Sequence, residues 1–290
     1  MGDSSPWETR KSERQLRGLN IPEGPSRAAS FKRILGLMLT PSPKILRCAG
    51  LLLLPVLFLL AASAQESGLT IDDILKKSID ARGGLEKLKA VESVKMTGKL
   101  VMGGGQMEAP MTLQLKRPAN MRLDMEFQGQ SVVQGYDGET AWMINPFTGG
   151  ADAQKMGEDE AEGMKEGSDL DGPLVDYKAK GHKIALVGKE DLVGKAVYKL
   201  KIDKKNGKTE TVYLDATTFL PVKTVALRKM MGNEMEMETS ISDYKAVSGV
   251  QMPYLIDSKS GGNSVMTITL EKIEANVPVE AAQFKMPAAK

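Results

Sequence analysis

Few side chains in this sequence have the type and spacing for catalysis. The single histidine, His182, opens a predicted strand in the run GHK, and an acid–base role would need a partner that the spacing does not show. No H-E-x-x-H pair, no Cys–His set and no phosphate-binding glycine loop is present. We therefore expect His182 to be a solvated strand-start residue and the protein not to be an enzyme.

Methionine is the more informative side chain. The sequence holds 18 methionines, and their thioethers could bind Cu(I). They alternate with Glu or Lys along predicted strands, however, and this periodicity favours an apolar face over a metal site. The acidic segment 158–171 lacks the order of a calcium-binding loop, and a loose divalent-ion site there stays open as an alternative. We expect no cofactor.

The run MMGNEMEMETSISDY, residues 230–244, shows the alternation most clearly. Met235, Met237 and Ile241 fall on one set of alternate positions, and glutamates and serines fall on the other. Successive side chains leave a strand on opposite faces, so this pattern predicts a half-buried strand. Methionine is a poor strand former with three rotatable bonds, which suits an apolar surface that must adapt to its contents.

The elements that must position these residues are mainly strands. Thr70 is a predicted helix cap, a helix follows to Gly83-Gly84, and LEKLKAV adds a short second helix. From Val94 onward, about ten or eleven strands follow at short spacing, with Asn206-Gly207 as a hairpin turn that needs positive φ at both positions. Between Gly149 and Gly172 the sequence could form a weak helix or a mobile loop, and the glycines argue against a stable helix. The pattern predicts a mainly β chain: one curved antiparallel sheet with helical cover.

The first 64 residues have the character of a leader. Leu51–Leu60 is apolar, with basic residues before it and Ala62-Ser63-Ala64 after it, which predicts a secretory signal peptide cleaved after Ala64. An uncleaved anchor is the alternative, although the run is short for a membrane span. Either Met1 or Met38 could be the true start. We therefore divide the chain into an extension and signal peptide, 1–64, and a mature domain, 65–290.

Processing changes the charge and removes the only cysteine. Residues 1–64 hold 9 of the 39 Lys and Arg and 4 of the 37 Asp and Glu, so the mature chain carries −3 rather than +2. This charge gives no reason to expect a nucleic-acid partner. Cys48 precedes the apolar run and would be lost with the leader, which leaves no disulfide.

Two blocks resemble a known family. Lys116-Arg117-Pro118 closes the strand TLQLKRP, and residues 135–147 read GYDGETAWMINPF. This pair resembles the periplasmic lipoprotein carrier LolA, and the order of elements agrees from Ile71 to Pro287, including a late Phe284. The phrases GPLVDYKAKG and DYKAVSGVQMPY are similar to the broader group of outer-membrane lipoprotein-sorting proteins. This chain departs from LolA by carrying Met121 and Leu123 where LolA has aromatics.

The resemblance implies a half-open β-barrel with an N-terminal helix and a lid segment. Its family holds the acyl chains of lipoproteins in an apolar cavity, loaded by an inner-membrane ABC exporter and unloaded to an outer-membrane receptor. By position, Arg117 would control the lid by holding lid carbonyls when the cavity is empty. Trp142 keeps a family position as cavity wall or plain core. The predicted cavity lining is Met96, Met121, Leu123, Met125, Trp142, Met143, Met235, Met237 and Met266.

We accordingly predict a monomeric periplasmic carrier of acylated lipoproteins or similar lipids. A sensor similar to RseB-like envelope regulators, binding lipid or protein without transport, is the alternative, and a structural envelope protein without cargo is a third hypothesis.

Overall fold

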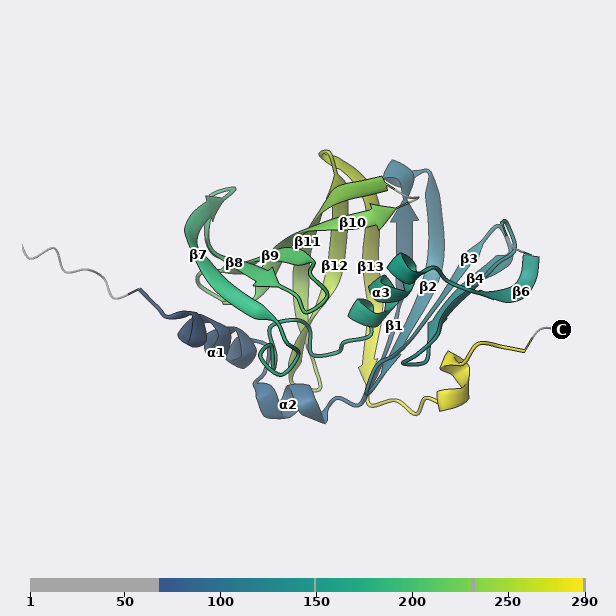
Figure 1. Ribbon diagram of the computed structural model, residues 1–290, viewed down its shortest axis with the longest axis horizontal. Coiled ribbons are helices and arrows are strands. Elements are labelled where there is room, and N and C mark those ends of the chain that lie inside the picture. The colour runs from purple at the N-terminus through teal and green to yellow at the C-terminus, as the bar shows by residue number, and fades with distance from the viewer. Residues whose placement is uncertain (1–67, 149, 231–232, 289–290) are drawn as a thin grey trace, which may run out of the picture. The chain divides into compact units, whose positions relative to one another are not determined.

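The computed structural model describes residues 68–148, 150–230 and 233–288, all of which belong to one compact unit, Ala64–Lys290 (Figure 1). The predicted signal peptide, Cys48 and the cleavage site after Ala64 lie outside the described residues and stay predictions.

One antiparallel sheet of 13 strands forms the body of the protein. The helices are α1 (Ile71–Ala81), α2 (Leu85–Ala90) and α3 (Glu158–Gly167), with short 3-10 turns η1 (Gly103–Gly105) and η2 (Ala281–Phe284). The strands are β1 (Ser93–Met102), β2 (Met107–Lys116), β3 (Asn120–Phe127), β4 (Gln130–Tyr136), β5 (Ala141–Asn145), β6 (Gly150–Lys155), β7 (Lys183–Leu192), β8 (Lys195–Asp203), β9 (Thr209–Asp215), β10 (Pro221–Met230), β11 (Asn233–Val247), β12 (Val250–Ser260) and β13 (Asn263–Ala275).

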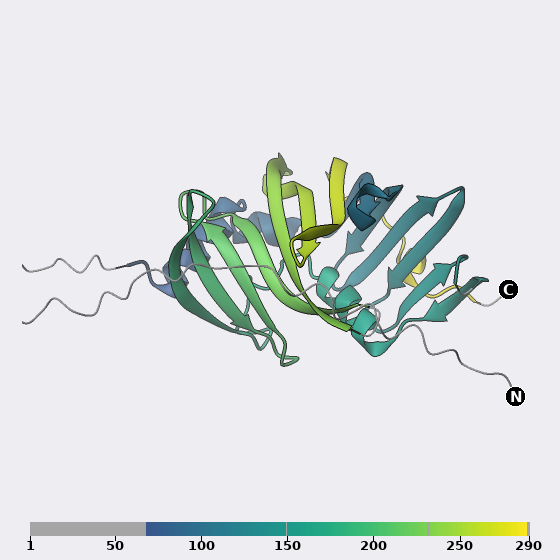
Figure 2. The same cartoon turned by 90° about the horizontal axis from the view of Figure 1, so that it is seen from above.

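The sheet curves strongly but does not close. Its strand order is β6-β5-β4-β3-β2-β1-β13-β12-β11-β10-β9-β8-β7, so β6 and β7 are the two edges although they are consecutive in the chain. The predicted half-open barrel is confirmed, with more strands than the pattern suggested. Residues 156–182, which we call the strap, therefore run from one edge of the sheet to the other, and Figure 2 shows α3 between the two halves.

The N-terminal helices follow the sequence prediction. Thr70 caps α1: its hydroxyl accepts a hydrogen bond from the Asp73 amide at 3.2 Å, and the Asp73 carboxylate accepts one from the Thr70 amide at 3.1 Å. Ile74 and Leu75 are buried on the face of α1 that packs against β8 and β9, and Leu88 of α2 joins the core over β1 and β13. The two helices thus close one end of the curved sheet (Figure 1).

One local prediction is wrong, and one segment that the sequence left open as a weak helix or a loop forms a helix. Only Gly207 of the Asn206-Gly207 turn has positive φ, and the Lys204 amide bonds to the Lys208 carbonyl, so the hairpin has a longer loop than the two-residue turn requires. The glycine-rich stretch before Gly172 does contain a helix, α3. Its amino end carries three acidic residues, and it is held by contacts with the sheet on two sides, which outweigh the low helix propensity of glycine.

The outer face of the sheet carries mostly polar and charged side chains, and the C-terminal segment covers a part of it. The Trp142 indole is fully buried there and donates a hydrogen bond to the Phe284 carbonyl at 2.8 Å. Arg122 lies within 5.9 Å of the same ring and donates to the Gln283 carbonyl at 2.9 Å. The ring lies directly against Gly135, the residue on β4 that is the cross-strand partner of Trp142.

This packing predicts that Gly135→Ala is destabilising. A Cβ atom at Gly135 would lie 2.3 Å from the indole, so the ring must move, and we expect the free energy of unfolding to fall by about 2 kcal/mol or more. Gly188→Ala is the matched control, because nothing lies within 4 Å of that position and its φ is not positive. Urea denaturation of both variants measures the difference. Equal stabilities would contradict the close approach.

Candidate functional site

The inner face of the sheet, which we define as the face beneath the strap, carries the predicted methionines. Cross-strand partners project from the same face of an antiparallel sheet. The register pairs Met143 with Gln134, Gln134 with Leu123, Leu123 with Leu113, and Leu113 with Met96. Met121 and Met125 alternate with Leu123 along β3, so they share this face.

The same face continues through the other half of the sheet. Met102, on the same alternate set of β1 as Met96, pairs with Met266, which pairs in turn with Ser258. Ser258 pairs with Thr239, and Met237 and Met235 alternate with Thr239 along β11. The structure therefore brings all the predicted methionines and Leu123 onto one face.

Trp142 is the exception among the predicted lining residues. It pairs with Gly135, which pairs with Arg122, and all three lie on the outer face. Of the two roles left open by the sequence, the structure shows a packed core residue under the C-terminal segment and not a wall of the inner face. A family position was recognisable in the sequence, but the face on which the side chain lies was not.

The inner face is most exposed at the end opposite α2. Met102, Met107, Met235 and Met266 come from strand ends that gather at the top of Figure 1, next to η1 and the turn at Gly261 and Gly262. Met235 is 37% exposed and Met107 is 51% exposed, whereas Met125 and Met237 are buried deeper along the face. The site is thus an apolar surface of flexible side chains that is open to solvent at one end.

Helix α3 contacts the two sides of the curved sheet with two different faces. Ala161 and Met164 pack with Tyr136 and Ala141, on strands β4 and β5, and we call this apolar side the near wall. A methyl group at Gly167 would lie 3.1 Å from the Met121 sulfur, so the helix rests directly on the inner face.

The opposite face of α3 is acidic. Asp159, Glu162 and Glu166 are spaced three and four residues apart, which places them on one side of the helix. They meet polar side chains of β8–β10 and the β8–β9 turn, which we call the far wall. The contacts are Glu166 with Lys204 at 3.0 Å and Arg228 at 2.9 Å, Glu162 with Asn206 at 2.7 Å, and Asp159 with Lys229 at 2.7 Å.

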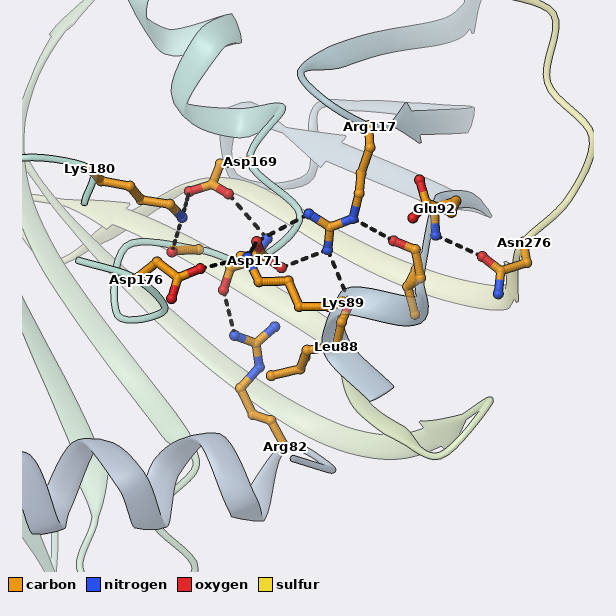
Figure 3. Close-up of polar contacts among 12 residues, drawn as sticks. Arg82, Leu88, Lys89, Glu92, Arg117, Asp169, Asp171, Asp176, Lys180 and Asn276 are labelled. Carbon is orange, nitrogen blue, oxygen red and sulfur yellow. Dashed lines mark hydrogen bonds and ion pairs between the residues drawn. The ribbon is translucent and has the colours of Figure 1, made fainter. Parts of the chain in front are cut away.

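Arg117 holds the second half of the strap. Its guanidinium forms a bidentate pair with the buried carboxylate of Asp171, with N–O distances of 2.6 and 3.1 Å (Figure 3). It also donates to the carbonyls of Leu88 and Val91, at 3.0 and 2.8 Å. The prediction that Arg117 holds lid carbonyls needs correction: the carbonyls belong to α2 and its C-terminal end, and the strap is held through a carboxylate.

Two further cations contact Asp171, one at its carboxylate and one at its backbone carbonyl. Lys89 contacts Asp171 at 2.6 Å and Asp176 at 2.7 Å, and Arg82 donates to the Asp171 carbonyl at 2.8 Å (Figure 3). Burial opposes ionisation of Asp171, but the hydrogen bonds from Arg117 and Lys89 outweigh it and lower the Asp171 pKa to about 2. Burial lowers the pKa of the Arg82 guanidinium. Sequence reasoning missed Asp171, Lys89 and Arg82, because no spacing links them to Arg117.

The remaining candidates show no catalytic or metal geometry. The His182 ring is half-buried and accepts a hydrogen bond from the Lys205 amide at 3.3 Å. In the described part of the chain, no group of three or more His, Cys, Asp or Glu side chains is arranged to hold a metal ion. None of the helices in the described ranges has the length and apolarity needed to cross a bilayer.

A curved, unclosed antiparallel sheet with helices on its inner side is a LolA-like fold, and the chain has this fold. Solved structures similar to it include a DUF1329 family protein from Desulfovibrio piger (TM-score 0.53, 13% identity, 74% of this chain and 97% of that chain) and a LolA superfamily protein from Nitrosomonas europaea (0.52, 12%, 75% and 98%). A domain from Vibrio parahaemolyticus described as an outer membrane lipoprotein-sorting protein is also similar (0.50, 11%, 72% and 97%). No family model and no curated protein sequence matches the chain.

The depressed pKa of Asp171 predicts an acid-sensitive fold. Because the native pKa of about 2 lies below the unfolded value of about 3.9, the ion pair stabilises the protein fully above pH 4 and its contribution is lost as the pH falls toward 2. We expect a loss of about 2 kcal/mol across that interval, measured as the free energy of unfolding in urea at each pH.

Asp171→Asn tests the assignment of this pH dependence. At pH 7 the variant should lose about 3 kcal/mol of stability, because the largely buried Arg117 guanidinium keeps no carboxylate partner, and it should lack the wild-type slope between pH 4 and 2. Asp176→Asn is the matched control: it also contacts Lys89, but its side chain is 47% exposed, so its effect should be small. An unchanged slope in Asp171→Asn would assign the acid sensitivity elsewhere.

Proposed function

We propose that this protein binds acyl chains on its inner face and carries them through the periplasm. The observation that supports the proposal most is the shared face of the predicted methionines and Leu123, beneath a strap and exposed at one end. Unbranched methionine side chains re-form around chains of different length with little rotamer strain. Each buried CH₂ group of a ligand contributes about 0.8 kcal/mol, so even partial burial gives useful affinity.

Lipoproteins or similar acylated cargo are the proposed ligands. The LolA-like fold supports this class of cargo, and the predicted signal peptide supports a periplasmic location. In this proposal an inner-membrane ABC exporter loads the protein and an outer-membrane receptor accepts the cargo. Co-purification of diacyl species with the protein, identified by mass spectrometry of organic extracts, tests the cargo directly.

Arg117 is the proposed gate of the strap. Its guanidinium joins the strap at Asp171 to carbonyls of α2 and of its C-terminal end, so the strap cannot lift there without breaking the bidentate pair. A ligand that enters the inner face at the exposed methionine end and extends toward α2 would meet the strap segment that Asp171 anchors. Release of this ion pair would then accompany loading.

Substitutions on the two faces of the sheet should separate binding from general stability. We expect the double variant Met235→Gln with Met266→Gln to bind a fluorescent acyl probe about tenfold more weakly or worse, because a near-isosteric amide replaces apolar contact surface. Leu227→Gln with Val101→Gln is the matched control on the outer face, where Leu227 is 57% exposed. Equal losses in both pairs would contradict the inner face as the binding face. If organic extracts of the wild-type protein contained no lipid and the protein bound no acyl probe, the proposed function would be contradicted.

Replacement of Arg117 should loosen the strap. Arg117→Lys keeps the charge but loses the planar fork, so we expect the strap amides of Ser168 and Gly172 to exchange hydrogen about tenfold faster. Arg122→Lys is the control, because Arg122 makes a comparable pair with Asp124 on the outer face. Hydrogen exchange with mass spectrometry measures both. Unchanged exchange in the strap of Arg117→Lys would show that Arg117 does not hold it.

A further inference from the structure

Arg228 places a positive charge beside the methionine surface. On strand β10 it is the direct cross-strand partner of Met235, so the two side chains leave the same face at neighbouring positions. The next pair of these two strands on the same face is Ala226 with Met237, both buried. A cation at the border of an apolar surface is the arrangement that suits a ligand with an acyl chain and an anionic head.

The guanidinium of Arg228 is only partly occupied by its partners among the described residues. Its side chain is 38% exposed, and within the described residues its one ion pair is with Glu166 of α3, at 2.9 Å. A guanidinium has five N–H donors in a rigid fork, so Arg228 retains donors for an oxygen anion. Lys204, the other cation in contact with Glu166, is 7% exposed and also pairs with Glu210 at 2.6 Å.

The charges at this position balance only when the strap is in place. Around the Glu166 carboxylate the far wall places Lys204 and Arg228 against Glu210, which leaves one positive charge that Glu166 of the strap matches; Asp159 and Lys229 form a separate pair. If α3 moves away, a partly buried cation loses its counter-charge, which is costly. A monoanionic ligand head that takes the place of the Glu166 carboxylate would restore the balance.

We propose that the site binds amphiphiles with a monoanionic head group, a carboxylate or a phosphate diester, and that the head replaces Glu166 at Arg228 while the acyl chain lies along Met235 and Met237. This inference rests on the proposed acyl-chain binding and specifies the class of ligand. It also makes head-group binding and release of the strap one exchange reaction, in which a carboxylate of the protein competes with the anion of the ligand.

Matched ligands isolate the head group. Oleate and oleyl alcohol share one acyl chain and differ in charge, so the ratio of their dissociation constants, measured by competition with a fluorescent acyl probe, reports the anion alone. We expect Arg228→Gln to reduce the preference for oleate on the order of tenfold. Glu166→Gln should increase it, because the competing carboxylate is gone, and a purely structural role of this ion pair would not raise the ratio.

Two controls make the result decisive. Lys272→Gln removes one positive charge from the outer face, where Lys272 pairs with Glu274 at 2.8 Å, and should leave the ratio unchanged. Lysophosphatidylglycerol in place of oleate shows whether the binding of a phosphate head group or of a carboxylate head group depends more strongly on Arg228. Circular dichroism verifies that the variants are folded.

The outcomes distinguish the two proposals. A ratio that is the same in wild type and Arg228→Gln, with both ligands bound, would overturn the head-group site and leave acyl-chain binding intact. Failure of wild-type protein to bind either ligand would overturn both.

Discussion

The bidentate ion pair between Arg117 and Asp171 is the contact on which the arrangement of the inner face depends. An unclosed sheet whose edges are consecutive in the chain needs a connection that spans the opening, and here that connection is the strap. Arg117 fixes the strap at its middle and the end of α2 with the same guanidinium. One side chain therefore sets how three separate segments lie around the inner face.

The two faces of the sheet are stabilised by different interactions: ion pairs on the outer face and apolar contacts on the inner face. The outer face carries mostly polar and charged side chains, with cross-strand ion pairs such as Lys99 with Glu108, so water can solvate it. The inner face is apolar over most of the sheet, and its methionines are less buried toward the open end. A rigid branched lining would pack more tightly but would offer one shape only, whereas methionine keeps the surface apolar and adaptable.

The sequence allowed much of the fold to be predicted but less of the site. Strict alternation at Met235 and Met237 identified a strand and its apolar side, because the period of a strand is local. The face of Trp142 was not predictable, since both faces can bury a tryptophan when a distant segment covers one of them. Asp171 was missed for the same reason: it meets Arg117 only after the strap has crossed the sheet. Helix α3 formed against the propensity of its glycines because its contacts are tertiary.

The two attachments of α3 differ in how they can be released. Ala161 and Met164 hold it to the near wall through apolar burial, which water cannot replace without cost. Glu166 holds it to the far wall in part through Arg228, whose side chain is 38% exposed, so water or another anion can take the place of the carboxylate there at a lower cost than in a buried pair. The far-wall contacts should therefore break first, so α3 would turn about its apolar contacts and uncover Arg228 together with Met235. The direction of opening follows from the chemistry of the two walls.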